Sequence, residues 1–318
     1  MKDRILNILK QRNDYVSGQE LADTLGVSRT AVWKAVTALK NDGYNITSVS
    51  RLGYLLDTSC DILNKWEIDF TDDFYFEDEV TSTSDLAKKF AAEGKKEFFF
   101  VTCNRQTAGK GRLGRTWSSP RGMNIYLSMI FYPDTDIRDV AQITPVMGIA
   151  AARTIEQVTG LDAGIKWPND IIINGRKAAG ILTEMQAEVD RILFVVAGIG
   201  INVNQTVFDG EIAKKATSLR LESGRIYKRA EIIKKLAENI KKYYGIFIKS
   251  GFPALKDEYK TLCINLGREV CATYRGERVT GTAADISDRG ELIIKTDSGF
   301  VPISGGEASL RNINNEYI

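Results

Sequence analysis

The hydrophobic pattern changes twice along this 318-residue chain, and the changes divide it into three segments. Apolar residues recur at helical spacing up to about residue 43, and mixed helix and strand patterns follow. Short strand-like runs separated by polar turns then fill residues 266–304. A single sheet or helical bundle does not carry all three patterns. We therefore predict an α+β protein with three domains, at residues 1–62, 63–264 and 265–318.

The first segment has the signals of two short helices followed by a hairpin. Ser17 and Glu20 have capping-box spacing, Gly26 allows a tight turn, and Ser28 can cap the next helix. Two strand-like runs then flank a glycine-containing tip. This order predicts a winged helix-turn-helix, whose second helix and hairpin tip face DNA. The residues expected on that DNA-facing surface are Arg29, Thr30, Trp33, Lys34, Thr37 and Arg51.

The charge of the chain supports DNA binding only weakly. The formal net charge is +2, and residues 1–60 hold eight Lys and Arg against six Asp and Glu, so the whole excess lies there. A small helical protein-interaction domain is the alternative. The modest charge predicts that DNA binding needs two copies of the chain on a two-fold symmetric site.

The other two segments are rich in strands. In the middle segment the Asn174-Gly175 pair is the strongest hairpin signal. The pattern predicts a mixed sheet with helices on one face, and the last segment predicts a small barrel. The expected middle strands are 98–102, 124–131, 171–173 and 192–201, and the expected helices are 84–93, 140–158 and 229–248.

The absence of histidine excludes whole classes of chemistry. Without it there is no Ser-His-Asp or Cys-His hydrolase, no His-ligated zinc or haem, and no His general base. No two of the four cysteines have C-x-x-C spacing, so a zinc knuckle or a thioredoxin motif is not expected. Four scattered cysteines in a chain of this length are typical of reduced thiols in the cytosol. No signal peptide or membrane-length apolar run is visible, so we expect a cytoplasmic protein with no membrane partner. An enzyme of this composition works with Lys, Arg, Asp, backbone amides or a bound metal ion.

A glycine- and arginine-rich stretch at 106–117 is the densest chemical motif. Its glycines fit G-x-G-x-x-G, but no helix follows them, so the dinucleotide-binding interpretation fails. A flexible loop remains, with Lys110, Arg112 and Arg115 available to neutralise an anion and Trp117 to stack on a purine. A solvated basic loop is the structural alternative.

Polar residues gather at the ends of apolar strands further on. Lys166 to Asp170 contains a turn-forming proline, Lys177 begins an apolar strand, and Gly198 to Asn202 ends another. Each piece has a structural explanation as a turn, an edge or close packing. Together they predict a site.

Taken in order, these motifs resemble those of the bifunctional biotin protein ligases that double as biotin operon repressors. The resemblance covers the whole chain and includes the Ser82-Thr83-Ser84 triplet and the terminal 305–311 motif. It implies a class II synthetase-like central domain and a C-terminal SH3-like barrel. It also implies two reactions: biotin and MgATP give biotinoyl-AMP and pyrophosphate, and biotin then passes to a lysine of a biotin carboxyl carrier protein.

The resemblance also implies roles for individual residues. Lys177, Arg112 and Asp170 would be catalytic, with Asp170 also expected near Mg²⁺. The residues implied for biotin are Ser82, Thr83, Ser84, Gln106, Lys110, Gly111, Arg112 and Lys177. Those implied for ATP and the adenylate are Gly109, Arg115, Trp117, Ser118, Lys166, Asn169 and Asn202.

Regulation is implied as well: biotinoyl-AMP would favour a homodimer that binds operator DNA and represses biotin genes. The family often has Arg where Lys110 stands, so adenylate retention is expected to differ here. Three alternatives stay open: a lipoate-type acyl-protein ligase, a repressor without ligase activity, and a ligase whose N-terminal domain does not bind DNA.

Overall fold

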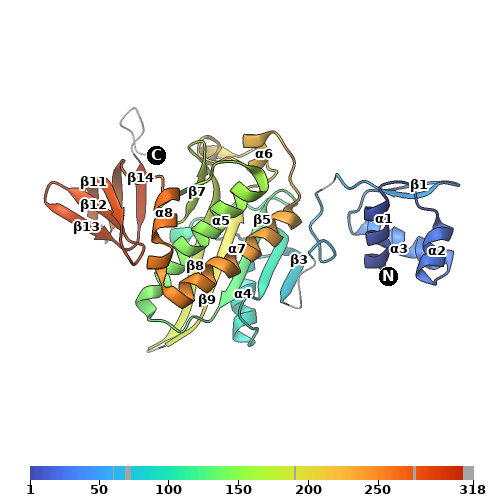
Figure 1. The fold of residues 1–318 in the computed structure, drawn as a ribbon, viewed down its shortest axis with the longest axis horizontal. Helices are drawn as coiled ribbons and strands as arrows, with labels where there is room; N and C mark the ends of the chain where they lie inside the picture. Colours follow the sequence, from blue (N-terminus) through green and yellow to red (C-terminus); the bar gives the residue numbers. More distant parts are fainter. Residues whose placement is uncertain (60, 69–72, 190, 275–276, 311–318) are drawn as a thin grey trace. The chain divides into compact units, whose positions relative to one another are not determined.

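The computed structural model describes residues 1–59, 61–68, 73–189, 191–274 and 277–310. The chain forms two compact units, Met1–Asp69 and Phe70–Ile318, each of which is described by itself (Figure 1). The three-domain division with boundaries at 62 and 264 stays a prediction. Residue 311, the last of the terminal motif named above, lies outside the described residues.

The first unit is a helix-turn-helix with a wing. Gly26, at φ 67°, ends the second helix with the left-handed turn that glycine adopts without strain. Its elements are α1 (Lys2–Arg12), α2 (Gly18–Leu25), α3 (Arg29–Asn41), β1 (Ile46–Val49) and β2 (Gly53–Leu56), with the two strands antiparallel.

Both predicted helix caps are confirmed. Ser17 Oγ accepts a hydrogen bond from Glu20 N at 3.0 Å, and Ser28 Oγ accepts one from Ala31 N at 3.2 Å. The Glu20 carboxylate pairs with Arg12 at 2.6 Å. Each cap satisfies a backbone donor that the helix itself leaves unpaired.

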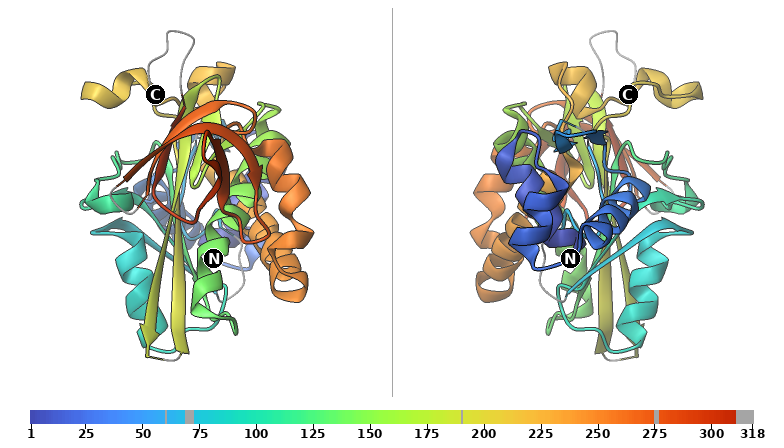
Figure 2. Two further views of the ribbon diagram at one scale, coloured as in Figure 1. Left: turned by 90° about the vertical axis from the view of Figure 1, so that its left-hand side faces the viewer. Right: turned by 90° about the vertical axis from the view of Figure 1, so that its right-hand side faces the viewer.

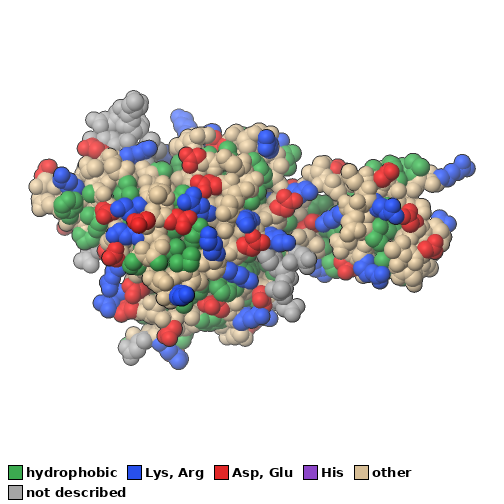
Figure 3. Space-filling view, in the orientation of Figure 1, with side chains coloured by type: hydrophobic (Ala, Val, Ile, Leu, Met, Phe, Trp, Pro, Cys, Tyr) green, Lys and Arg blue, Asp and Glu red, His purple; other side chains and the backbone are tan. Residues whose placement is uncertain are grey.

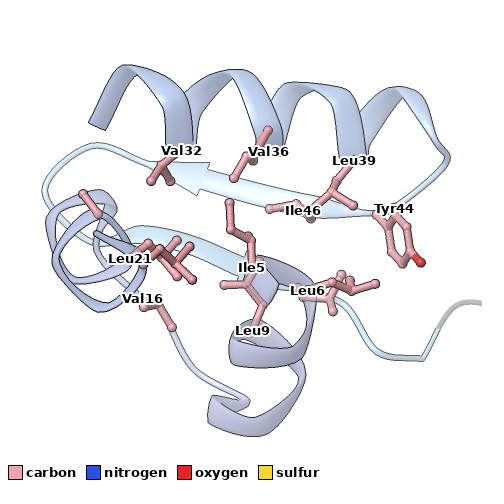
Figure 4. Packing of buried hydrophobic residues seen from close by; sticks show 14 residues of the cluster. Ile5, Leu6, Leu9, Val16, Leu21, Val32, Val36, Leu39, Tyr44 and Ile46 are labelled. Atoms are coloured by element: carbon pink, nitrogen blue, oxygen red, sulfur yellow. The ribbon is translucent and has the colours of Figure 1, made fainter. Parts of the chain in front are cut away.

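The core of this unit is formed by apolar side chains from all three helices and the hairpin. Ile5, Leu21, Val32 and Leu39 are fully buried and point toward one another (Figure 4). The segment at 61–68, at the end of this unit, is held against the helices by polar contacts: Tyr44 Oη donates to Glu67 Oε1 at 2.6 Å. Trp66 Nε1 donates to Asp42 Oδ2 at 3.2 Å.

The second unit is built on a seven-stranded mixed sheet in the order β3-β4-β5-β9-β8-β7-β6. The β3–β4 pair is parallel and the other pairs are antiparallel. The strands are β3 (Phe74–Val80), β4 (Phe100–Gln106), β5 (Ile125–Phe131), β6 (Gly164–Lys166), β7 (Asp170–Ile173), β8 (Arg176–Glu188) and β9 (Arg191–Ile201). The predicted Asn174-Gly175 hairpin joins β7 to β8, with φ of 48° and 76°.

Helices cover both faces of this sheet, which corrects the expectation of helices on one face. The helices α5 (Ile143–Thr159) and α7 (Arg229–Ser250) pack together on one face, and α4 (Thr83–Ala92) packs on the other, where Ala87 and Ala91 meet Ile130 and Val196 (Figure 2). The reason is local: α4 is the crossover between the parallel strands β3 and β4.

The last segment forms a five-stranded antiparallel sheet in the order β13-β12-β11-β10-β14. Its strands are β10 (Glu269–Tyr274), β11 (Glu277–Ile286), β12 (Leu292–Thr296), β13 (Gly299–Ile303) and β14 (Glu307–Leu310). The sequence pattern predicts strands at 269–274, 279–286, 291–296 and 300–304, which correspond to the first four, and it misses β14. The sheet is anchored to the central one through Trp167, whose Nε1 donates to Gly290 O at 3.0 Å and whose N donates to Asn265 Oδ1 at 2.7 Å.

The remaining helical segments are short. They are η1 (Arg112–Gly114), η2 (Ile137–Gln142), η3 (Gly210–Lys214), α6 (Leu219–Ser223), η4 (Phe252–Ala254) and α8 (Lys256–Leu262). Within the described ranges, none of the helices combines the length and apolarity that crossing a membrane requires. On the face drawn in Figure 3, Lys and Arg alternate with Asp and Glu over both units, in keeping with the net charge of +2.

Candidate active site and DNA-binding surface

A cavity with two compartments lies on the face of the central sheet that carries α4. The first compartment is narrow, about 50 Å³, and the second is about 530 Å³. Both are lined by Gly111, Arg112, Trp117, Asn169 and Lys177, so these residues mark the junction between them.

Glycines on β8 and β9 form the floor of the first compartment. A Cβ on Gly198 would lie 2.7 Å from Ser84 Oγ, and a Cβ on Gly200 would lie 2.5 Å from Trp117 Cε2. A Cβ on Gly180 would lie 3.0 Å from the same indole. Because real side-chain carbons do not approach closer than 3.0 Å, positions 198 and 200 require glycine for α4 and Trp117 to lie directly on the strands, and a Cβ on Gly180 would press against the indole.

A chain of hydrogen bonds closes one end of the first compartment. Gln106 Oε1 accepts from the backbone N of Thr83 at 2.9 Å and from its Oγ1 at 3.1 Å. The Ser128 hydroxyl lies 2.8 Å from Thr83 Oγ1 and 3.1 Å from Ser84 Oγ. This buried cluster can donate and accept, which suits a polar ring without charge.

Ser82 has a different place from its neighbours. It is 1% exposed and caps α4, accepting from Asp85 N at 3.4 Å, and it is not among the cavity-lining residues. Ser128 is absent from the sequence-based site. Its signal in the sequence is the single serine in the otherwise apolar and aromatic run of β5, and the structure buries it fully.

The loop that follows β4 folds back on itself. Gly111 N donates to Arg115 O at 2.7 Å, and Trp117 N donates to Gly109 O at 2.9 Å. Gly109 is buried, and a Cβ there would lie 2.5 Å from Trp117 O. Gly109 therefore lets the loop close tightly rather than lining the cavity.

Lys110 reaches from this loop to the first turn of α4. Its Nζ donates to Asp85 Oδ1 at 2.6 Å, and this hydrogen bond raises the pKa of Lys110 above its usual value. Lys110 therefore stays charged at the rim of the first compartment. An exposed pair of this kind contributes little to stability, so its main effect is to orient the ammonium group.

Lys177, Asp170 and Arg112 meet at the junction. Lys177 Nζ lies 2.7 Å from Asp170 Oδ1 and 5.4 Å from the Trp117 ring centroid. Arg112 donates to Asn169 Oδ1 at 2.9 Å and to Gly306 O at 3.0 Å, which ties the loop to both the β6–β7 turn and the C-terminal sheet. Two cations at the border of two compartments can neutralise an anion that spans both.

The second compartment has polar, cationic and apolar linings. Predicted residues that line it are Arg115, Trp117, Ser118, Lys166, Asn169, Asp170 and Asn202. Asn202 is 5% exposed and donates to Thr217 O at 3.0 Å. The sequence-based site misses Phe208, Ile212, Ile264, Lys214, Lys215 and Arg268. These come from the segment after β9 and from the start of the C-terminal sheet, where no motif marks them.

Asp170 is the candidate metal ligand. Within the described ranges, no group of three or more His, Cys, Asp or Glu side chains is placed to hold a metal ion. Mg²⁺ is commonly held by one or two carboxylates together with substrate phosphates. A single carboxylate at the junction fits a Mg²⁺ ion that enters with a nucleotide.

A separate groove lies in the first unit, between α3 and the wing. Its volume is about 700 Å³, and Arg29, Thr30, Trp33 and Arg51 line it. The Trp33 side chain is 58% exposed, which is unusual for a tryptophan without a partner. Lys34 and Thr37 are exposed on the same helix but outside the groove. All six residues predicted to face DNA are therefore exposed.

Comparison with known proteins agrees with this geometry. Residues 76–202 match the Biotin/lipoate A/B protein ligase family, residues 2–55 match an HTH domain, and residues 266–311 match the Biotin protein ligase C terminal domain. The chain is 36% identical to the bifunctional ligase/repressor BirA of Bacillus subtilis, over 97% of this chain and 98% of that one. The chain belongs to the bifunctional biotin protein ligase/repressor family.

Other members of this ligase/repressor family and its structural relatives are similar over large parts of the chain. The bifunctional ligase/repressor BirA of Escherichia coli is 27% identical over 98% of this chain and 99% of its own length. The structure of the Aquifex aeolicus biotin protein ligase in complex with biotin and ATP superposes with a TM-score of 0.66. It is 29% identical and covers 76% of this chain and 100% of its own.

Proposed function

We propose that this chain joins biotin to a lysine of a biotin carboxyl carrier protein through biotinoyl-AMP, and that with biotinoyl-AMP bound it represses biotin genes. The chain is a biotin protein ligase with a DNA-binding domain, as its family membership shows. The observation that carries the assignment of the site is the junction, where Lys177 and Arg112 lie between a polar pocket and a nucleotide-sized cavity.

In this proposal biotin occupies the first compartment. The Thr83, Ser84 and Gln106 cluster meets its ureido ring, and the carboxylate reaches Lys177 and Arg112. Because the first compartment is only about 50 Å³, the loop at 107–117 must open to admit biotin. Opening of this loop breaks the Lys110–Asp85 and Arg112–Asn169 hydrogen bonds, and closure over biotin forms them again.

ATP occupies the second compartment. Asn202 and Trp117 serve the adenine, while Arg115, Lys166 and Asn169 serve the phosphates. Gly111 and Ser118 supply the backbone around them, and Gly109 keeps the loop closed. A carboxylate oxygen of biotin attacks the α-phosphorus, the bond to the bridging oxygen breaks, and pyrophosphate leaves with that electron pair. This step needs alignment and charge neutralisation, which Lys177 and Arg112 supply, and no proton has to be removed.

Mg²⁺, when bound with ATP, would neutralise phosphate charge, and Asp170 is the residue that would hold it. Asp170 has a second proposed task in the transfer step. The carrier lysine attacks the carbonyl carbon of the mixed anhydride, an amide forms, and AMP leaves. The attacking amine loses a proton, and Asp170 is the carboxylate at the junction that can accept or orient it.

Repression requires two copies of the chain in this proposal. Among the six residues predicted to face DNA, three are basic, namely Arg29, Lys34 and Arg51. Three are too few for tight binding by one unit, so a two-fold operator would bind a homodimer. Biotinoyl-AMP, by ordering the loops around it, would favour that dimer. Sedimentation with and without biotin and ATP tests the link, and an unchanged monomer–dimer ratio would contradict it.

The ligase assignment is tested with Lys177→Ala. We expect biotin-dependent pyrophosphate release to fall by more than about 100-fold, because the reacting carboxylate and phosphate lose a neutralising charge. Lys241→Ala is the control, since Lys241 is exposed on α7 and lies outside the cavity. Normal pyrophosphate release by Lys177→Ala would overturn the assignment.

A further inference from the structure

The second compartment contains more positive charge than the adenylate needs. Among its described lining residues, Asp170 is the only carboxylate, and it is already paired with Lys177 at 2.7 Å. The lining cations are Arg112, Arg115, Lys166, Lys177, Lys214, Lys215 and Arg268. The phosphate of biotinoyl-AMP carries a single negative charge, so the seven lining cations carry more positive charge than that phosphate and Asp170 together balance. An excess of one sign in a cavity indicates a more highly charged ligand.

Three of these cations have no role in the proposed binding of biotin, adenine or Mg²⁺. Lys214, Lys215 and Arg268 are exposed, line only the second compartment, and have no side-chain ion pair among the described residues. No family motif covers Lys214 and Lys215, and the loop that carries them follows β9. Cations left without partners in a cavity are available to an anionic ligand.

The backbone holds this group close to the junction. Lys177 N donates to Lys215 O at 2.7 Å, and Thr217 N donates to Lys177 O at 2.9 Å, so the loop is fixed against the start of β8. On the other side, Arg268 N donates to Asn265 O at 3.1 Å, and Asn265 Oδ1 accepts from the backbone N of Trp167 at 2.7 Å. Arg268 is thereby held near the turn that carries Asp170.

We propose that Lys214, Lys215 and Arg268 bind the β- and γ-phosphates of ATP and the pyrophosphate that leaves. The inference rests on the proposed function and deepens it by assigning a leaving-group site. These cations stabilise the charge that develops on the bridging oxygen as its bond to the α-phosphorus breaks. They take no part in transfer, because pyrophosphate is absent from that step.

The two half-reactions separate this role from a general role in the fold. Lys214→Gln, Lys215→Gln and Arg268→Gln are made as single variants. In each one we expect the inhibition constant for added pyrophosphate and the KM for ATP both to rise about tenfold, because one cation is removed. Transfer of biotin from preformed biotinoyl-AMP to the carrier should keep the wild-type rate. Lys214→Arg, Lys215→Arg and Arg268→Lys retain the charge and should restore most of the pyrophosphate inhibition. Lys234→Gln, an exposed lysine of α7 outside the cavity, is the matched control.

Two results would overturn the leaving-group site. One is unchanged pyrophosphate inhibition in the three glutamine variants. The other is a transfer rate that falls in parallel with adenylate formation, which would assign these cations to the adenylate itself. Failure of the wild-type chain to release pyrophosphate with biotin would instead refute the proposed function, so the two failures are distinguishable. Thermal unfolding with and without pyrophosphate gives a second measurement of the same affinity in any variant that folds.

Discussion

Replacing Gly200 by alanine is expected to disable the enzyme through Trp117. The added Cβ would lie 2.5 Å from Trp117 Cε2 and 2.7 Å from Nε1, whereas non-bonded carbons in contact stay about 3.5–4.0 Å apart. Gly200 lies on β9, which pairs with β5 on one side and β8 on the other, so the backbone has little freedom to yield. The indole must therefore move by about 1 Å.

That movement reaches the junction. The Trp117 ring lies 5.4 Å from Lys177 Nζ, so a shift of the ring changes its contact with the lysine at the junction. Misplacing a positioned group by about 1 Å costs on the order of 100-fold in rate, which corresponds to about 2.7 kcal/mol. Overpacking of this kind costs about 1–3 kcal/mol of stability. Adenylate formation should thus fall about 100-fold while the chain stays folded.

The assay measures biotin-dependent pyrophosphate release together with thermal unfolding. Gly245→Ala is the control, because Gly245 is exposed on α7 and no atom lies within 4 Å of its added Cβ. That control should keep full activity and gain about 0.5–1 kcal/mol in stability. The double variant Gly200→Ala/Trp117→Ala removes the clash, so its loss should be smaller than the sum of the two single losses. Wild-type activity and unchanged tryptophan fluorescence in Gly200→Ala would refute the reasoning.

Three further predictions concern other parts of the molecule. Trp33→Ala should weaken operator binding by about tenfold in a mobility-shift assay, because an apolar contact to a base is lost, and it should leave ligation unchanged; equal affinity would contradict a DNA contact by Trp33. Lys110→Arg should slow the dissociation of biotinoyl-AMP, measured by stopped flow, because a guanidinium can give the Asp85 carboxylate two parallel donors and hold the loop closed; a faster dissociation would contradict this role. Burial works to raise the pKa of Glu222, but hydrogen bonds from Thr217 and Asn174 and the charge of Arg176 outweigh it and lower the pKa below the usual glutamate value of 4.5. Its contribution to stability is present above pH 4.5 and is lost as the pH falls through the lowered pKa, so Glu222→Gln should destabilise the chain by about 2 kcal/mol near neutrality and flatten the acid side of its stability curve; an unflattened curve would count against this account.

Local rules were enough to predict the first unit. The caps at Ser17 and Ser28, the turn at Gly26 and the hairpin each depend on residues within a few positions of one another. The same holds for the Asn174-Gly175 turn and for the helix at 229–248, which the structure extends to residue 250. Such elements are predictable because their energetics do not depend on distant partners.

The site was predictable where its chemistry is concentrated in a motif. Lys177, Arg112 and Asp170 were expected from their segments, and the structure brings all three to the junction. Their individual roles stay predictions. The residues that sequence reasoning missed depend on tertiary packing. Lys214 and Arg268 reach one cavity only through the fold, and Ser128 becomes part of the polar cluster only because α4 lies on its face of the sheet. The crossover that puts α4 there also explains why helices occupy both faces.

The glycine floor also limits how ligand specificity can be changed. At positions 180, 198 and 200 the side chain is already as small as an amino acid allows, so every substitution there narrows the pocket. Space for a bulkier analogue of biotin can come only from the walls, for example from Leu182 or Tyr126, which line the same compartment. Variant libraries aimed at larger analogues should therefore keep the three glycines fixed and diversify the walls.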